Sequence, residues 1–295
     1  MGEIPISNSK WKWLILGLGF SFLYIPILIL IFYSFNASRL VTVWAGFSIK
    51  WYGELFHDDL LMNGVRLSLI IGFMSASAAV VLGTIAAFVL NRFGRFRGAG
   101  MFSFMITAPL VMPDVIMGLS LLLMFIALGS VFDIFSDRGM LTIWIAHVTF
   151  CTSYVCIVVS SRLREVDMSI EEAAMDLGAP PWKVFFLITL PSIFPAIVAG
   201  WLLAFTLSLD DLVIASFVSG PSATTLPMVV FSSVRLGVSP KINALATIIV
   251  LVVATATWIA WYLMSRAEKR RQQEIHAALR DEQIITPAHH LQESQ

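Results

Sequence analysis

The chain has 295 residues, of which 58% are hydrophobic and only 13% are charged, and its formal net charge is zero. Soluble domains carry about twice that share of charged residues, and a neutral chain has no general attraction for nucleic acid. Cys151 and Cys156 are the only cysteines and lie in one apolar run, so neither a disulfide framework nor a CxxC metal site is expected. No pair of the five histidines forms an HExxH-like metal site. The composition therefore indicates an integral membrane protein.

Six segments are long and apolar enough to cross a bilayer, which takes about 20 residues as a helix. In chain order they cover residues 13–35, 67–90, 101–128, 140–161, 192–217 and 243–265. Because backbone polar groups cannot remain unpaired in lipid, each segment is expected to be helical. The sequence predicts an all-α membrane protein with six transmembrane helices. Its membrane domain covers residues 13–265, with residues 1–12 before it and a polar tail, residues 266–295, after it.

The basic residues favour an orientation with both termini in the cytoplasm. This orientation places thirteen of the 19 lysines and arginines on the cytoplasmic side and six outside. The segment between the fourth and fifth spans, about residues 162–191, is then cytoplasmic. In the outer loop, SIKWYGELF mixes Trp51, Tyr52 and Phe56 with charges, which predicts a helix at the outer interface.

Three acidic residues, Asp114, Asp210 and Asp211, lie inside the predicted spans. Each would cost about 2.5–3.5 kcal/mol at the bilayer centre on insertion scales, so each should face protein or water. Pro109 and Pro113 favour a kink in the third span beside Asp114. Two interpretations remain open for these acids: pairing with a basic or hydroxyl side chain of a neighbouring span, or a conduction path for cations.

Aromatic side chains can hold alkylammonium groups by cation–π contact. Trp144, Tyr154 and Trp201 are candidates, although most of the nine tryptophans are expected to be packing residues or interface anchors. His147 is expected to make a polar contact within the bundle rather than to contact a substrate. The two cysteines are expected to be small packing residues.

The cytoplasmic segment predicts two short helices. In the first, Ser169 and Glu172 match a capping box, and Gly178 suits a left-handed helix end. In the second, WKVFFLITL, Pro180 and Pro181 suit the first turn, and Pro191 would close the helix.

One apolar stripe runs along the first of these helices. It consists of Ile170, Ala173, Ala174 and Leu177. A helix this short is marginal alone in water, so the stripe needs a surface to cover it. That surface is either a groove on another protein or this protein's own spans and the lipid headgroups.

Glu172-Ala173-Ala174, three residues, Gly178, nine residues and Ile188-x-Leu190-Pro191 resemble the EAA loop of binding-protein-dependent ABC importer permeases. The resemblance implies the six-helix fold of type I ABC importers, with the loop docked into a cleft of a cytoplasmic ATPase. It also implies a second permease subunit in a heterodimer, two ATPase subunits and a periplasmic binding protein, in a bacterial inner membrane. The expected coupling residues are Glu172, Ala173, Ala174, Asp176, Leu177 and Gly178.

The chain contains no Gly-Lys pair, so it has no phosphate-binding loop of its own. ATP and Mg²⁺ are therefore expected on the partner ATPase, and no cofactor or metal is expected in this chain. The chain is expected not to be an enzyme.

The segments FYSFN, APLVMPD and TLSLDDLV resemble the polyamine group of these permeases, and most of all those of putrescine transporters. The resemblance implies a substrate path for flexible diamines or triamines. Its expected residues are Asp114, Asp210, Asp211, Trp201 and Tyr154. One alternative is the same class of permease with another cation or an amino acid as substrate. The other is an intramembrane aspartyl protease, although the GxGD motif that such enzymes share does not occur.

Overall fold

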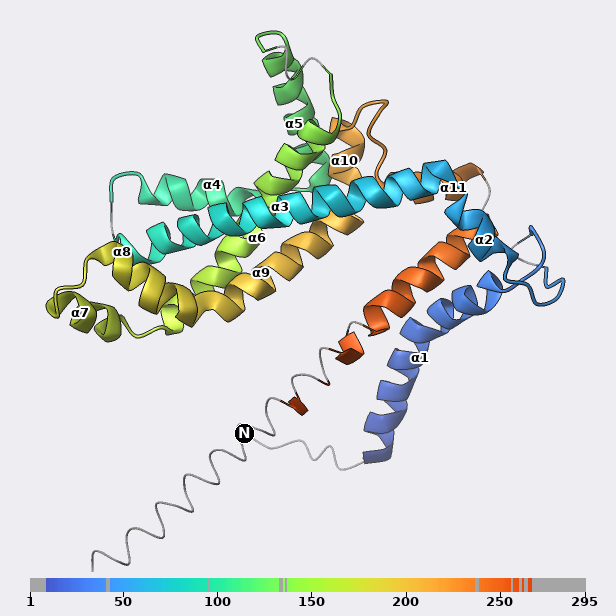
Figure 1. Ribbon diagram of the computed structural model, residues 1–295, viewed down its shortest axis with the longest axis horizontal. Helices are drawn as coiled ribbons and strands as arrows, with labels where there is room; N and C mark the ends of the chain where they lie inside the picture. Colours follow the sequence, from blue (N-terminus) through green and yellow to red (C-terminus); the bar gives the residue numbers. More distant parts are fainter. Residues whose placement is uncertain are drawn as a thin grey trace, which may run out of the picture. The chain divides into compact units, whose positions relative to one another are not determined.

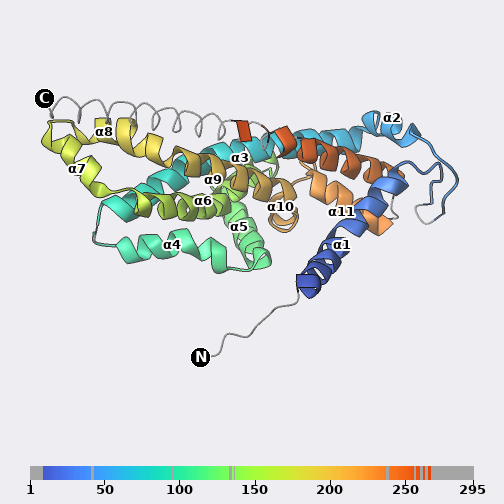
Figure 2. The same cartoon turned by 90° about the horizontal axis from the view of Figure 1, so that it is seen from below.

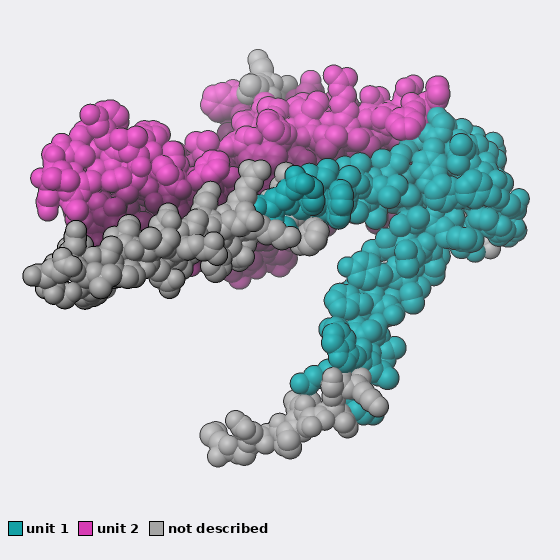
Figure 3. Space-filling view, turned by 60° about the horizontal axis from the view of Figure 1, so that its bottom comes forward, with its two compact units in different colours: residues 1–55, 239–295 teal, residues 56–238 magenta. Residues whose placement is uncertain are grey.

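The computed structural model describes residues 9–40, 43–94, 96–132, 135, 137–236, 239–255, 257–259, 262 and 265–266. Residues 1–8 and most of the predicted tail lie outside the described residues. The part that is described is helical, and its only extended pairing is an isolated bridge between Asn36 and Phe47. The chain forms two compact units, residues 1–55 with 239–295 and residues 56–238 (Figure 3).

Five helices in the described residues are long and apolar enough to span a membrane, or six if one sharply bent pair counts as a span. They are Trp11–Ser34, Asp59–Arg92, Met140–Glu165, Pro181–Asp210, Pro240–Ile259 and the bent pair Ala99–Val111 with Asp114–Gly129. These helices overlap all six predicted segments, and the all-α prediction is confirmed.

The first unit contains α1 (Ser9–Ser34), helix Pro240–Ile259 and most of α2 (Lys50–Phe56). The predicted helix of the outer loop is therefore present as α2. However, Trp51 is buried, and its indole Nε1 donates to the backbone oxygen of Asn36 at 2.6 Å. Trp51 thus holds the loop together rather than facing outwards, while Phe56 is exposed.

The second unit is built around α3 (Asp59–Arg92), α6 (Met140–Glu165) and α9 (Leu190–Asp210), which pack against one another (Figures 1 and 2). Small residues let these helices approach closely. A Cβ added at Gly83 of α3 would lie 2.8 Å from the Val155 side chain of α6, and one at Gly200 of α9 would lie 3.3 Å from the same side chain. Val155 is fully buried between the three helices.

The third predicted span is broken rather than kinked. α4 (Ala99–Val111) and α5 (Asp114–Gly129) meet at an angle of 117°. Met112 is extended, with φ −74° and ψ 135°, because a residue before proline is driven out of the helical region. Pro113 then becomes the N-cap of α5, so Asp114 is the first residue of a new helix.

The fifth predicted span is also interrupted. α9 ends at Asp210, Asp211 is extended, and α10 (Val213–Val218) follows, with α11 (Leu226–Leu236) after a loop. The expectation of one helix through residue 217 was wrong. The reason is that the carboxylate of Asp211 accepts the backbone N–H groups of Ile214 and Ala215, and so starts a second helix.

The segment between α6 and α9 differs from the prediction at both of its helices. α7 (Met168–Asp176) begins two residues earlier than a Ser169 cap would allow, because Asp167 is the cap and accepts from the Ser169 N–H at 2.9 Å. Hydrogen bonds from the backbone and the side chain of Ser169 hold the pKa of the Asp167 carboxyl below its usual value. Gly178 has a φ of +86°, as the predicted left-handed helix end requires.

Pro191 does not close the second helix. α8 (Pro181–Val184), a π-helical turn η2 (Phe185–Thr189) and α9 run on without interruption. Pro191 lacks the N–H that would bond to the residue four positions earlier. The wider turn just before it instead pairs the Leu190 N–H with the Phe185 oxygen.

Candidate functional site

A cavity of about 310 Å³ lies in the second unit where the two broken helices come together. Four of the five residues predicted for a substrate path line it: Asp114, Tyr154, Asp210 and Asp211. The remaining lining residues are mostly apolar: Pro109, Met117, Phe150, Leu207, Leu212, Val213 and Ile214. The cavity is thus lined by three acidic residues together with aromatic and aliphatic side chains.

Asp114 stands at the start of α5, is exposed and lines the cavity. Among the described residues, no hydrogen bond or ion pair engages its carboxylate. The N-terminal end of a helix carries partial positive charge, which favours an ionised carboxylate there. Asp114 therefore presents a charge that no cation of the described chain neutralises.

The carboxylate of Asp211 has three hydrogen-bonding partners. His147 lies 3.2 Å away through Nε2, and the N–H groups of Ile214 and Ala215 donate to the carboxylate at 3.2 and 2.7 Å. His147 is itself 1% exposed, and its Nδ1 lies 2.6 Å from the Ser208 hydroxyl of α9. The two ring nitrogens of His147 thus bridge the Ser208 hydroxyl of α9 and the Asp211 carboxylate. The contact within the bundle that was expected of His147 is present.

Asp210, one residue earlier, is different. Among the described residues, no hydrogen bond or ion pair with another residue engages its carboxylate, and the residue is exposed. It stands at the C-terminal end of α9, where the last carbonyl groups of a helix lack partners and point outwards. Asp210 and these carbonyls form an electronegative rim that suits a cation.

Tyr154 and Trp201 lie in different surroundings. Tyr154 lines the cavity together with Phe150, which lies four residues earlier on the same face of α6. Trp201 is not among the lining residues: its Nε1 donates to the Ser77 hydroxyl of α3 at 3.2 Å, and its ring stacks on Phe205. Trp201 therefore joins α9 to α3. The i,i+4 spacing from Tyr154 was the signal that could have identified Phe150.

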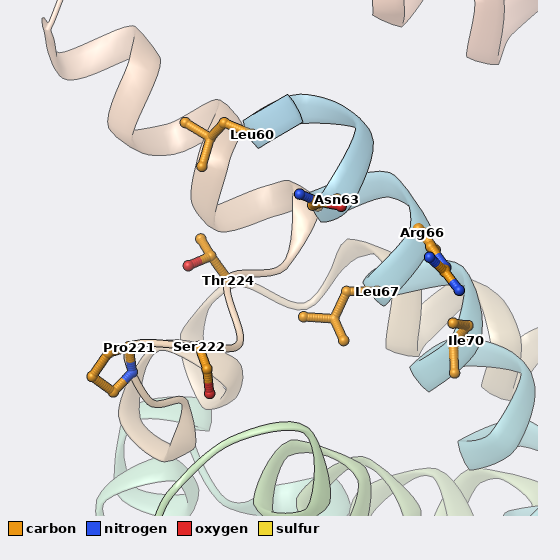
Figure 4. Close-up of a pocket in the computed structure, with 9 residues that line it drawn as sticks. Leu60, Asn63, Arg66, Leu67, Ile70, Pro221, Ser222 and Thr224 are labelled. Atoms are coloured by element: carbon orange, nitrogen blue, oxygen red, sulfur yellow. The ribbon is translucent and has the colours of Figure 1, made fainter. Parts of the chain in front are cut away.

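A second pocket, of about 420 Å³, lies between the start of α3 and the loop before α11 (Figure 4). Arg66 is its only charged lining residue, and the others are apolar or neutral: Leu60, Asn63, Gly64, Leu67, Ile70, Pro221, Ser222 and Thr224. A pocket whose single charge is positive does not suit a cationic ligand. The electrostatics of the two sites therefore favour the acidic cavity.

The surface of α7 and the turn after it is exposed. Leu177 is 90% exposed, and more than half of the surface of Ile170 is exposed. Trp182 and Leu187, in the helix after this turn, are exposed as well. The predicted coupling residues Glu172, Ala173, Asp176 and Gly178 are also exposed, and Ala174 is half-buried. The apolar stripe thus remains uncovered by the described part of the chain.

A bundle of membrane-spanning helices with two breaks around an acidic cavity, and an uncovered helical loop between two spans, defines a membrane permease subunit. The chain belongs to the family of inner membrane components of binding-protein-dependent transport systems, whose family model matches residues 79–273.

Known relatives agree with this assignment. The chain is 68% identical, over 95% of its length and all of the relative's, to the putrescine transport system permease protein PotI of Escherichia coli K12. It is 43% identical, over 79% of its length and 85% of the relative's, to the spermidine/putrescine transport system permease protein PotC of the same organism. These relatives are transport permeases, and they give no support to the alternative of an intramembrane protease.

A solved structure shares the fold. It is a bacterial ABC transporter involved in the import of the acidic polysaccharide alginate, with a TM-score of 0.68 at 17% identity, covering 90% of this chain and 99% of that one. The predicted type I ABC importer permease fold is thereby confirmed. The chain is a multi-pass protein of the inner membrane.

Proposed function

We propose that this chain is the permease subunit of an ATP-driven polyamine importer, with putrescine as its substrate. The observation that carries the proposal is the acidic cavity, in which Asp114 and Asp210 are not neutralised by any described side chain. The 68% identity to a putrescine permease over 95% of the chain supports the choice of substrate.

A short diamine has two ammonium groups separated by an apolar linker, and the lining of the cavity suits both parts. Asp114 and Asp210 supply two carboxylates from two different helix ends. The outward carbonyls at the end of α9 add acceptors for ammonium protons. Phe150 and Tyr154 offer ring faces to the linker and to alkylammonium charge.

The chain needs partners to complete the transporter. In this proposal a second, different permease covers the exposed side of the cavity, and a periplasmic binding protein delivers the substrate. Two cytoplasmic ATPase subunits, which hold ATP and Mg²⁺, dock on the exposed surface of α7 through Glu172, Ala173, Ala174, Asp176, Leu177 and Gly178. The preponderance of basic residues on one side supports cytoplasmic termini and a cytoplasmic α7.

Transport by the reconstituted complex tests the proposal. Proteoliposomes containing both permeases and the ATPase, supplied with the binding protein, should accumulate labelled putrescine only when ATP is present on the side of the membrane where the ATPase lies. Unlabelled putrescine, spermidine, lysine and a neutral amino acid are then compared as competitors. Stronger competition by an amino acid than by both polyamines would contradict the proposed substrate and favour the alternative permease.

A further inference from the structure

A buried ion pair joins α7 to the end of α3. Arg92, the last residue of α3, places Nη2 3.0 Å and Nε 3.3 Å from Oε1 of Glu171. The two side chains are only 9% and 10% exposed. Arginine and glutamate are almost never buried unless they are paired, and removing one partner leaves a buried charge without compensation. The pair is therefore a strong constraint on where α7 can lie.

A third side chain completes the arrangement. The hydroxyl of Thr189 donates to the same Oε1 of Glu171 at 3.0 Å, and Thr189 is 1% exposed. Thr189 is the last residue of the π-helical turn that leads into α9. One carboxylate oxygen of α7 thus accepts hydrogen bonds from the ends of two different spans.

The surroundings of this triad are loosely packed. A cavity of about 280 Å³ adjoins it, and its other walls are apolar: Phe88, Phe93, Met168, Met175, Pro181, Val184 and Phe185. Among the described residues, the triad makes all of the side-chain hydrogen bonds that link α7 to the spans. The position of α7 therefore depends on three polar contacts rather than on close apolar packing.

The neighbouring residue extends the connection to the third span of this group. Asn91 donates to the Ser160 hydroxyl of α6 at 3.0 Å and accepts from Nε of Arg164 at 3.2 Å. Two adjacent residues at the end of α3 thus hold α6 and α7. Glu171 is thus connected to α3, to α6 through Asn91, and to α9, whose other end carries Asp210.

We propose that Arg92, Glu171 and Thr189 form a clasp that positions α7 and couples its movement to α3 and α9. The inference rests on the proposed function in so far as the movement is driven by the ATPase. These three are positioning residues, since none of them lines the acidic cavity. The clasp faces the bundle, whereas the stripe of Ile170 and Leu177 faces away from it and stays free for docking.

The test compares Glu171→Gln, Arg92→Gln and Thr189→Val with a control variant, Glu165→Gln. Glu165 forms an ion pair with Arg162 at the same end of the bundle, but the pair lies within one helix and its side chains are 46% and 62% exposed. Exposed pairs of this kind contribute little. In proteoliposomes of the complete complex, each clasp variant should retain the ATPase but consume at least about tenfold more ATP per substrate transported. The Glu165→Gln control should behave as the wild type.

Two further measurements separate positioning from general damage. Exchanging the two charges, Arg92→Glu with Glu171→Arg, should recover part of the coupling that each single change loses. In the purified permease without ATPase, backbone amides of residues 168–176 should exchange hydrogen faster in Glu171→Gln, and to a smaller extent in Thr189→Val, but not in Glu165→Gln. The exchange measurement does not depend on the substrate, so it decides on the clasp even if putrescine is not transported. Unchanged exchange together with an unchanged ATP requirement in Glu171→Gln and Thr189→Val would overturn the proposal.

Discussion

Asp210 and Asp211 are neighbours in the chain but differ in what their carboxylates contact. Adjacent residues of a helix point about 100° apart, and the backbone leaves the helix at Asp211, which is extended. Both residues line the cavity, but only the carboxylate of Asp211 is bonded to His147 and to the N–H groups of α10. We therefore propose that Asp211 maintains the fold and that Asp210, with Asp114, contacts the substrate.

Asp114→Asn tests the contact with the substrate. Asparagine keeps the size and the hydrogen-bonding capacity but removes the charge, and a hydrogen bond to a charged group is worth about 1.5–3 kcal/mol. Uptake of labelled putrescine in cells is expected to fall by about 10- to 150-fold, with unchanged abundance in the membrane. Asp59→Asn is the control, because Asp59 also stands in the first turn of a helix but does not line the cavity. Wild-type uptake and half-saturation in Asp114→Asn would remove this residue from the path.

The pair of adjacent aspartates gives opposite expectations. Asp211→Asn replaces one acceptor oxygen by an amide group that donates, and so leaves His147 or an N–H of α10 without a partner. The unfolding free energy should fall by about 1–3 kcal/mol, measured as thermal unfolding of the permease in detergent. Asp210→Asn should unfold like the wild type and lose transport instead. The same loss of stability in both variants would contradict the separation of roles.

At the scale of the elements, the breaks in the third and fifth spans place the acids where they are. Both Asp114 and Asp211 stand at helix N-termini, whose partial positive charge favours carboxylates. Asp210 stands at a helix C-terminus, where carbonyl groups are free. The unbroken helices α3 and α6, packed closely around Val155, provide the rigid frame for these breaks.

The close approach of α3 and α6 predicts a strong effect at Gly83. A Cβ there would lie 2.8 Å from the Val155 side chain and 3.0 Å from the Cys156 nitrogen, so the helices would have to separate. Gly83→Val is expected to lower the unfolding free energy by about 1–3 kcal/mol. Thermal unfolding checks this, with Gly100→Ala as control, since nothing lies within 4 Å of a Cβ at Gly100. Equal stability of the two variants would show that the frame tolerates separation.

The turn after α7 predicts a loss of ATPase binding. Gly178 has a φ of +86° and open space around it, so Gly178→Val strains the backbone without a steric clash. Ala173→Trp enlarges the exposed stripe instead. Both variants should insert normally and retain at most about a tenth of the ATPase on purification, if docking loses about 1.4 kcal/mol or more.

Gly98→Val is the control for strain as such, because Gly98 has a φ of +93° and is the N-cap of α4, outside α7 and the turn after it. Full recovery of the ATPase with both loop variants would refute docking through this surface. Equal loss in Gly98→Val would attribute the effect to instability rather than to the loop.

At the scale of the whole molecule, the fold has an acidic cavity near the breaks and a polar clasp at the other end of α9. Helix Pro181–Asp210 connects the two, because it begins in the exposed turn after α7 and ends at Asp210. A rigid helix with one end at the docking surface and the other at the cavity can link a partner's movement to access for the substrate.

The orientation in the membrane is tested by labelling single cysteines. Cys151 and Cys156 are buried, so they should not react with a membrane-impermeant maleimide. Ile49→Cys, in the outer loop, should be labelled in intact spheroplasts, and Leu177→Cys only after permeabilisation, since both side chains are exposed. Labelling of Leu177→Cys alone in intact spheroplasts would reverse the proposed orientation.

The sequence by itself determined the features that depend on local composition. Apolar runs of sufficient length specified the spans, Gly178 the left-handed turn, and the pattern of the loop the family. The tertiary structure decided what depends on contacts between distant segments. His147 and Asp211 are 64 residues apart, and Arg92 and Glu171 are 79 residues apart. Periodicity placed Glu171 off the apolar stripe, and only the packing of α7 on α3 shows that this polar side is buried. The aromatic ring of Trp201 predicts a place on the substrate path. In the structure this side chain contacts Ser77 and Phe205 instead, and so joins two helices. The sequence determines the chemistry of each side chain, but the tertiary structure determines its partner. The reason is that a buried charge without a partner is costly, so the stable fold is one in which it is paired.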